Sequence, residues 1–163
     1  MIRALALALM LLLGACGLRP MYAGGASGQV ASGLGTIQVA PIPERAGWLV
    51  RNALVDRLGR EAAGPAYRLE VELDDNITSF GLRGDSSATR ERRTLRARYR
   101  LVDLGSGQVV LDATAGSDAG IDIVSSEYAT VAAEQTAQER LARVIADQMV
   151  SRLALFVRNR GGK

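Results

Sequence analysis

The feature that most restricts the fold is a regular alternation of apolar and charged residues in two segments of the chain. Residues 67–74 read YRLEVELD, and residues 95–101 read LRARYRL. Successive side chains of an extended strand point to opposite faces of a sheet. Both segments therefore predict strands with one buried face and one charged face, a pattern typical of antiparallel sheets that are solvated on one side.

Further strands and helices are expected on either side of these segments. Ile37 and Val39 alternate with polar residues before Pro41, and proline cannot donate to a strand ladder, so a first strand should stop there. Apolar residues at three- and four-residue spacing indicate two amphipathic helices. The second should begin after Ser126, a suitable N-cap. The expected elements are a strand over 36–42, a helix ending near 61, strands over 66–80, 92–104 and 109–115, and a helix to about 158.

These elements predict an α+β fold, a mixed four-stranded sheet packed on two helices in the order β-α-β-β-β-α. The glycine-containing turn at 104–108 predicts a hairpin, so the last three strands should form an antiparallel meander. A helix follows the strand over 36–42, and such a crossover leads to parallel pairing. We expect residues 116–125 to form a polar loop and residues 36–160 to form one domain.

The first fifteen residues have the composition of a cleaved secretion signal. One arginine precedes an apolar run that is too short for a membrane-spanning helix, which needs roughly 20 residues. The run ends in the sequence LGAC, which resembles the bacterial lipobox. We therefore expect residues 1–15 to be removed, and Cys16 to carry a diacylglycerol and an N-linked acyl chain. Two or more acyl chains hold a protein stably on a membrane.

Residues 16–35 are rich in glycine, serine and alanine and predict a flexible tether between the lipid and the domain. Cys16 is the only cysteine, so the chain forms no internal disulfide. The formal net charge is +3, and it falls to +2 when Arg3 is removed with the signal. Such a small charge gives no indication of a nucleic-acid partner.

The residues that most enzymes depend on are missing. The chain has no histidine, and its one cysteine is expected to be acylated, which removes the commonest general base and the best nucleophile. Asp74 and Asp75 are adjacent, and neighbours on a strand point to opposite faces, so they should not form a catalytic pair. Glu91, among arginines, is expected to be their charge partner. We therefore expect neither an enzyme nor a metal or cofactor beyond the lipid.

Charge is concentrated in a row of arginines on one face of the expected strand over 92–104. One interpretation is a track for an anionic partner, such as a phosphorylated lipid or an acidic protein wall. The alternative is neutralisation within the sheet, because an antiparallel neighbour would bring acids opposite these arginines. The row consists of Arg90, Arg92, Arg96, Arg98 and Arg100, and the acids are Glu70, Glu72 and Asp74.

Four arginines at the loop end of this strand have no acid opposite them in the expected pairing. They are the candidate contacts for an anionic ligand: Arg83, Arg90, Arg92 and Arg93. Trp48 is the only tryptophan and lies off the main apolar stripe of its helix. We expect it at the edge of the core, since tryptophan is usually well buried, with a partner contact as the alternative.

The start of the mature chain resembles a known family. Cys16 is followed at once by GLRPMY, which is similar to the opening of alphaproteobacterial lipopolysaccharide-assembly lipoproteins, the LptE family. The expected order of elements also resembles that family. In the first helix, Arg51, Leu54 and Leu58 are similar to its R-x-x-L stretch.

The resemblance implies a lipid-anchored protein on the periplasmic face of the outer membrane. Such proteins plug and help to assemble the LptD β-barrel, and the pair delivers lipopolysaccharide to the cell surface. The expected partners are therefore LptD, lipopolysaccharide and the membrane that holds the lipid anchor. The alternative is an auxiliary lipoprotein of another envelope machine, such as an ABC-type lipid transporter or a peptidoglycan synthase activator.

Overall fold

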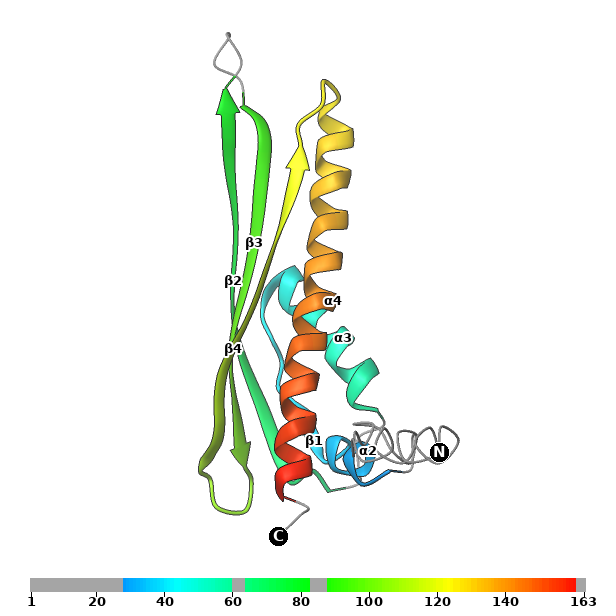
Figure 1. Ribbon diagram of the computed structural model, residues 1–163, viewed down its shortest axis with the longest axis vertical. Helices are drawn as coiled ribbons and strands as arrows, with labels where there is room; N and C mark the ends of the chain where they lie inside the picture. The colour runs from blue at the N-terminus through cyan, green and yellow to red at the C-terminus, as the bar shows by residue number, and fades with distance from the viewer. Residues whose placement is uncertain (1–27, 60–63, 83–87, 161–163) are drawn as a thin grey trace, which may run out of the picture.

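The computed structural model describes residues 28–59, 64–82 and 88–160. Within them three helices and four strands follow one another, the strands forming a single mixed sheet. Figure 1 shows these elements: α2 (Gln29–Leu34), β1 (Ile37–Val39), α3 (Glu44–Leu58), β2 (Tyr67–Leu82), β3 (Ala88–Asp103), β4 (Val109–Asp122) and α4 (Glu127–Arg160). The predicted fold class, α+β with a mixed four-stranded sheet packed on helices, is confirmed.

The strands lie side by side in the order β1-β2-β3-β4. β1 pairs with β2 in parallel, as predicted from the crossover through α3. The other two pairings are antiparallel, so β2, β3 and β4 form the expected meander. β1 is only three residues long and reaches no farther along β2 than Leu69. The two edges of the sheet are therefore β1 with the rest of β2 on one side, and β4 on the other.

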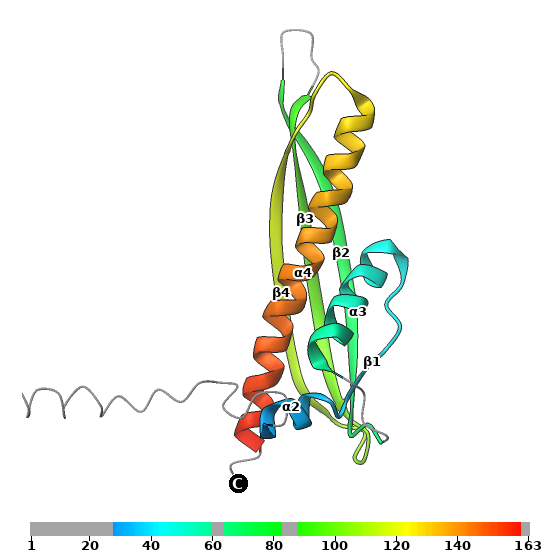
Figure 2. The ribbon, with the colours of Figure 1, turned by 90° about the vertical axis from the view of Figure 1, so that its right-hand side faces the viewer.

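The molecule is elongated, and α4 runs along most of its length. Figures 1 and 2 show α2, β1 and the end of α4 at one end, and the β2–β3 hairpin with the start of α4 at the other. α3 covers part of the same sheet face beside α4, and α2 packs against the last turns of α4. No helix among the described residues is both long enough and apolar enough to cross a membrane.

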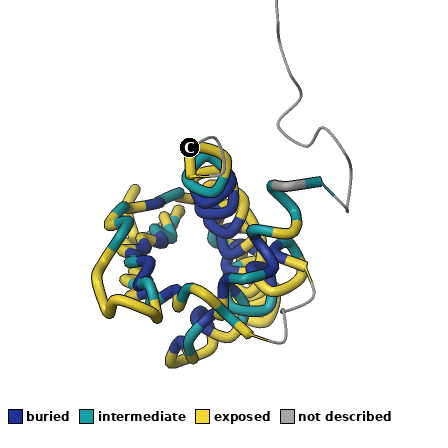
Figure 3. Tube along the Cα trace, turned by 90° about the horizontal axis from the view of Figure 1, so that it is seen from below, coloured by how far each residue is buried: buried dark blue, intermediate teal, exposed yellow. Residues whose placement is uncertain are grey.

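The core lies between one face of the sheet and the helices. The inward residues of β3, Leu95, Tyr99 and Leu101, are at most 2% exposed. They face a helical stripe that was expected from its spacing and whose centre, Ile145 and Met149, is fully buried. Viewed along the long axis, the buried parts of sheet and helices face each other (Figure 3). The Ser126 hydroxyl accepts a hydrogen bond from the Ala129 amide at 3.4 Å, which confirms the predicted N-cap.

Several element boundaries differ from expectation, including the start of β3, which lies at Ala88 rather than at residue 92. The tether was predicted to continue to residue 35, but Gln29–Leu34 form α2, whose Leu34 is 2% exposed. The loop predicted over 116–125 was wrong up to Asp122, because β4 continues to that residue. α3 ends at Leu58, where Gly59 takes a positive φ of 86°, rather than near 61. Residues 1–27, including the expected signal and Cys16, lie outside the described residues.

Candidate functional site: the arginine face of the sheet

The face of the sheet that points away from the helices is a ladder of acids and arginines. The predicted neighbours are confirmed in the register, where Glu70, Glu72 and Asp74 of β2 lie directly opposite Arg100, Arg98 and Arg96 of β3. Arg100 forms ion pairs with Glu72 at 3.3 Å and with Glu70 at 3.7 Å. The middle of the arginine row is therefore partly neutralised within the sheet, as the second interpretation of the sequence expected.

β4 contributes a second column of acids that the sequence interpretation did not include. Asp112 accepts two hydrogen bonds from Arg98, and the closer oxygen lies 2.9 Å from the Arg98 Nη2. This contact and the charge of Asp112 raise the pKa of Arg98, and the same contact and the charge of Arg98 lower the pKa of Asp112. Because β4 had been expected to stop at residue 115, its farther acids had been assigned to a loop.

The farther acids of β4 pair with arginines that the sequence left unmatched. Arg90 lies 3.1 Å from Asp122, and Arg92 lies 3.9 Å from Asp118. The guanidinium of Arg92 also stacks 5.6 Å from the centre of the Phe80 ring. The expectation that these two arginines lack an acid was therefore wrong. All four charged side chains are more than half exposed, so the pairs are weak and open to exchange with another anion.

Arg93 lies on the opposite face, in a polar cluster between the sheet and α4. Its guanidinium donates two hydrogen bonds to Asp75, at 2.8 and 2.6 Å, and both side chains are 13% exposed. Gln138 of α4 donates to the same carboxylate at 2.8 Å. Burial opposes ionisation of Asp75, but these hydrogen bonds and the charge of Arg93 outweigh it and lower the pKa of Asp75. Arg93 is therefore unavailable to a ligand on the arginine face.

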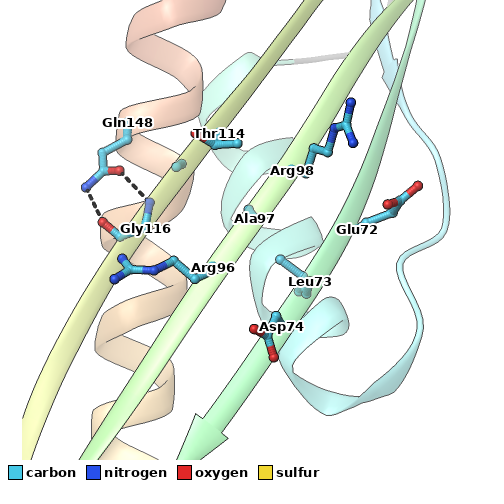
Figure 4. Close-up of a pocket in the computed structure, with 10 residues that line it drawn as sticks. Glu72, Leu73, Asp74, Arg96, Ala97, Arg98, Thr114, Gly116 and Gln148 are labelled. Carbon is cyan, nitrogen blue, oxygen red and sulfur yellow. Dashed lines mark hydrogen bonds between the residues drawn. The ribbon is translucent and has the colours of Figure 1, made fainter.

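Arg96 differs from the other arginines of this face in its ion pairing. It forms no ion pair with any residue that the structure describes, although Asp74 is its register neighbour. Figure 4 shows its side chain crossing β4 beside Gly116, away from Asp74. A Cβ atom at Gly116 would collide with the Arg96 guanidinium. The absence of a side chain at Gly116 therefore gives Arg96 its position.

An open groove of ≈ 660 Å³ surrounds Arg96. Its residues come from three strands and α4: Glu72, Leu73, Asp74, Arg96, Ala97, Arg98, Thr114, Ala115, Gly116 and Gln148. Gln148 reaches from α4 to the edge strand, where its amide accepts from the Gly116 N–H at 3.1 Å and donates to the Gly116 carbonyl at 3.3 Å (Figure 4). The groove is thus a depression lined by two acids and two arginines, in which Arg96 is the cation without an ion pair to a described residue.

Two other sequence expectations are corrected. Glu91 was expected to pair with the neighbouring arginines, but its Oε1 accepts a hydrogen bond from Ser79 at 3.2 Å and it forms no ion pair within the described part of the chain. It occupies an odd position of β3 and therefore points away from the arginine face. Trp48 was expected at the edge of the core, but it is 62% exposed on α3. Asp74 and Asp75 do point to opposite faces, as predicted.

A match to a family model shows which protein family the chain belongs to. The LptE family, described as lipopolysaccharide-assembly, matches residues 34–153. The chain belongs to the LptE family. The match covers every strand of the sheet and most of α4, so it confirms the resemblance that was based on the residues after Cys16 and on the order of elements.

Solved lipoprotein structures share the fold of this LptE-family chain. A putative lipoprotein from Caulobacter crescentus is 29% identical, with a TM-score of 0.69 over 82% of this chain and 98% of that one. Rare lipoprotein B from Shewanella oneidensis is 9% identical, with a TM-score of 0.60 over 77% and 96%. A minor lipoprotein from Acinetobacter baumannii is 13% identical, with a TM-score of 0.56 over 73% and 88%. No curated protein sequence matches the chain.

Among the described residues of this LptE-family chain, no group of three or more histidine, cysteine, aspartate or glutamate side chains is placed to hold a metal ion. The chemistry that the arginine face can support is the binding of anions. An anion could bind Arg96 without displacing an acid, whereas at Arg90 and Arg92 it would replace Asp122 and Asp118. The sequence signal for Arg96 was its place in the arginine row. The position of its side chain depends on Gly116, which is 20 residues away in the chain. The expected strand over 109–115 ended before Gly116, so the sequence did not predict that Gly116 lies opposite Arg96.

Proposed function

We propose that this protein is an outer-membrane lipoprotein that serves as the plug and assembly partner of the LptD β-barrel. Its lipid-carrying residue is Cys16, with a diacylglycerol and an N-acyl chain, and the domain lies on the periplasmic face. The observation that carries the proposal is the family match over residues 34–153. An elongated domain with a densely ion-paired polar face also suits the polar interior of a barrel. The role is non-catalytic and requires no cofactor beyond the lipid.

Co-purification tests the barrel partnership. The full-length lipoprotein, carrying a C-terminal affinity tag, is extracted from native membranes in mild detergent. A large partner whose electrophoretic mobility changes on heating is expected, as for a β-barrel. Recovery with an inner-membrane ABC transporter or a peptidoglycan synthase would favour the alternative, an auxiliary lipoprotein of another envelope machine. A Cys16→Ser variant tests the lipid attachment separately from the barrel partnership, because it should lose membrane attachment and retain the fold.

We further propose that the arginine face binds phosphate groups of lipopolysaccharide. The groove around Arg96 supports this most directly, because that guanidinium is exposed and forms no ion pair with a described residue. Of the four arginines expected from the sequence, Arg90 and Arg92 remain candidates, Arg93 is turned inward, and Arg83 lies outside the described residues. Arginine's planar fork suits phosphate because it can donate two parallel hydrogen bonds.

Capture of lipopolysaccharide by the purified protein tests this contact. A hydrogen bond to a charged group contributes about 1.5 kcal/mol or more, so Arg96→Gln should weaken binding by about tenfold. Arg140→Gln, an exposed change on α4 away from the arginine face, is the matched control. Equal binding by both variants, with far-ultraviolet circular dichroism unchanged, would contradict a role for Arg96.

A further inference from the structure

The described chain begins at the end of the molecule where α4 finishes. α2 packs on the last turns of α4, and the backbone of Gly33 lies directly against the Val157 side chain. Figures 1 and 2 both show α2, the end of α4 and the β3–β4 hairpin at this end. Cys16 precedes Gly28 by twelve residues, which span at most about 40 Å. Lipid on Cys16 would therefore keep this end near the bilayer.

The β3–β4 hairpin presents two exposed apolar side chains at the same end. Leu104 is 40% exposed and Val109 is 50% exposed. The turn between them is held in one conformation, because the Asp103 carboxylate accepts hydrogen bonds from the amides of Gly105 and Ser106, each at 3.0 Å. The Gly107 amide also donates to the Asp103 carbonyl at 2.8 Å. The two apolar side chains are thus displayed to solvent by a fixed turn.

The last turns of α4 place positive charge beside this hairpin. Arg160 ties the two together, because its Nη1 lies 3.5 Å from Asp103 Oδ2 and donates to the Tyr67 hydroxyl at 3.1 Å. Arg152 and Arg158 are exposed and form no ion pair with any described residue. Residues 149–160 contain three arginines and no acid. Two of the three arginines at this end of α4, Arg152 and Arg158, are therefore uncompensated by any described acid, and Arg160 is paired with Asp103.

We propose that this end of the domain docks on an anionic phospholipid surface. The docking face consists of Leu104, Val109, Arg152, Arg158 and Arg160. Its apolar residues enter the boundary between headgroups and acyl chains, while the arginines bind the lipid phosphates. The proposal rests on the proposed lipid attachment at Cys16, and adds that the protein itself makes a second contact that fixes the domain's orientation on the membrane.

The composition of the docking face favours a bilayer over a protein partner. The centre of a protein–protein interface is depleted of charged residues and is formed by close-packed apolar and aromatic side chains. Here two apolar side chains stand on one turn, Arg160 contacts that turn, and Arg152 and Arg158 lie in the last turns of α4 at the same end. A membrane surface accepts this combination, because each cation near anionic lipid contributes attraction and each small apolar group adds burial.

Fluorescence quenching by brominated phospholipid measures the proposed contact. The acylated full-length protein is reconstituted into phosphatidylglycerol–phosphatidylcholine vesicles with brominated acyl chains. Trp48→Phe removes the only native tryptophan, which is exposed. In that background Leu104→Trp reports on the hairpin, and Tyr128→Trp, at an 86% exposed position at the opposite end, is the control. Strong quenching is expected for the first reporter and little for the second.

Charge removal tests the arginines separately from the anchor. A cation near an anionic surface contributes about a fivefold preference for the docked state, so Arg158→Gln should lower the ratio of docked to undocked protein about fivefold. Arg140→Gln, in the middle of α4, should leave it unchanged, and vesicles of phosphatidylcholine alone should weaken quenching of the hairpin reporter. Flotation with equal quenching of both reporters would overturn the docking face alone. Failure of the protein to float with vesicles would overturn the lipid attachment and the docking together.

Discussion

At the scale of single residues, the contact that joins sheet and helix most specifically is the cluster of Arg93, Asp75 and Gln138. Two strands and α4 each contribute one side chain, and the ion pair is largely shielded from water. Removing one member of a buried pair is costly because the other charge is left without a partner, whereas exposed pairs contribute little. Breaking the cluster by removing one member is therefore expected to cost far more stability than breaking any pair on the arginine face.

Replacement of Asp75 tests this difference. Asp75→Asn should lower the free energy of unfolding by about 3 kcal/mol, since Arg93 keeps its charge in a largely buried position. Asp112→Asn breaks the exposed pair with Arg98 and should leave the free energy of unfolding almost unchanged. Urea denaturation followed by circular dichroism measures both. Equal losses in the two variants would show that burial does not set the strength of these pairs.

The lowered pKa of Asp75 also predicts how stability depends on pH. Its pKa is lower in the folded than in the unfolded chain, so its ionisation stabilises the fold above the unfolded value of about 3.9. This contribution is lost as the pH falls through the folded pKa. Between pH 6 and pH 3, the wild type should lose more unfolding free energy than Asp75→Asn, because the other acids are common to both proteins. Parallel pH profiles for the two would contradict the assignment.

At the scale of elements, β4 is an edge strand of the sheet, and α4 supplies at one point the hydrogen bonds that a neighbouring strand would make. The Gln148 amide pairs with both backbone groups of Gly116, as another strand would. Gln148→Ala should speed amide hydrogen exchange at Gly116 about fivefold, since one hydrogen bond of about 1 kcal/mol is lost. Gln135→Ala, exposed on the same helix, is the control. Unchanged exchange at Gly116 would mean that the edge is protected without the amide.

The elements that could be predicted are those whose inward residues are large. Leu69, Val71 and Leu95 made the alternation visible, and the register of acids against arginines followed from it. The far half of β4 was missed because its inward residues include Ala115 and Ala119, whose small side chains give little hydrophobic contrast with Gly116 and Ser117 between them. α2 was missed because it has only six residues, of which Ser32 and Gly33 are poor helix formers. The helix is stabilised by the packing of Val30 and Leu34 on the core, which the sequence does not show.

The candidate site was predictable only in part, for the same reason. The arginine row and its facing acids are local properties of two strands with clear alternation. The special position of Arg96 and the pairing of Arg90 and Arg92 depend on the third strand, whose length could not be read from small residues. The error in the expected end of β4 thus led to an error in the ion pairs expected for the arginines of β3.

At the scale of the whole molecule, burial is concentrated around the middle and end of α4. Its residues 127–136 are exposed except for Thr130 and Glu134, which are half-buried, whereas Leu141, Ile145 and Met149 are almost completely buried. A helix of about ten residues has marginal stability in water without tertiary packing. The first turns of α4 therefore extend from the core, and their conformation depends on the packed part of the helix.

This asymmetry predicts a large effect of one side-chain truncation on α4 and a small effect of another. Ile145→Ala should lower the free energy of unfolding by about 3 kcal/mol, because it leaves a cavity at a fully buried site. Val131→Ala, at a 43% exposed site, should change it by less than about 0.5 kcal/mol. Hydrogen exchange should likewise be faster over 127–136 than over 141–154 in the isolated lipoprotein. A large loss of stability from Val131→Ala would mean that the far end of α4 is packed as firmly as its centre. If the first turns are free in this way, a partner enclosing this end would slow exchange over 127–136 and leave the already protected centre almost unchanged.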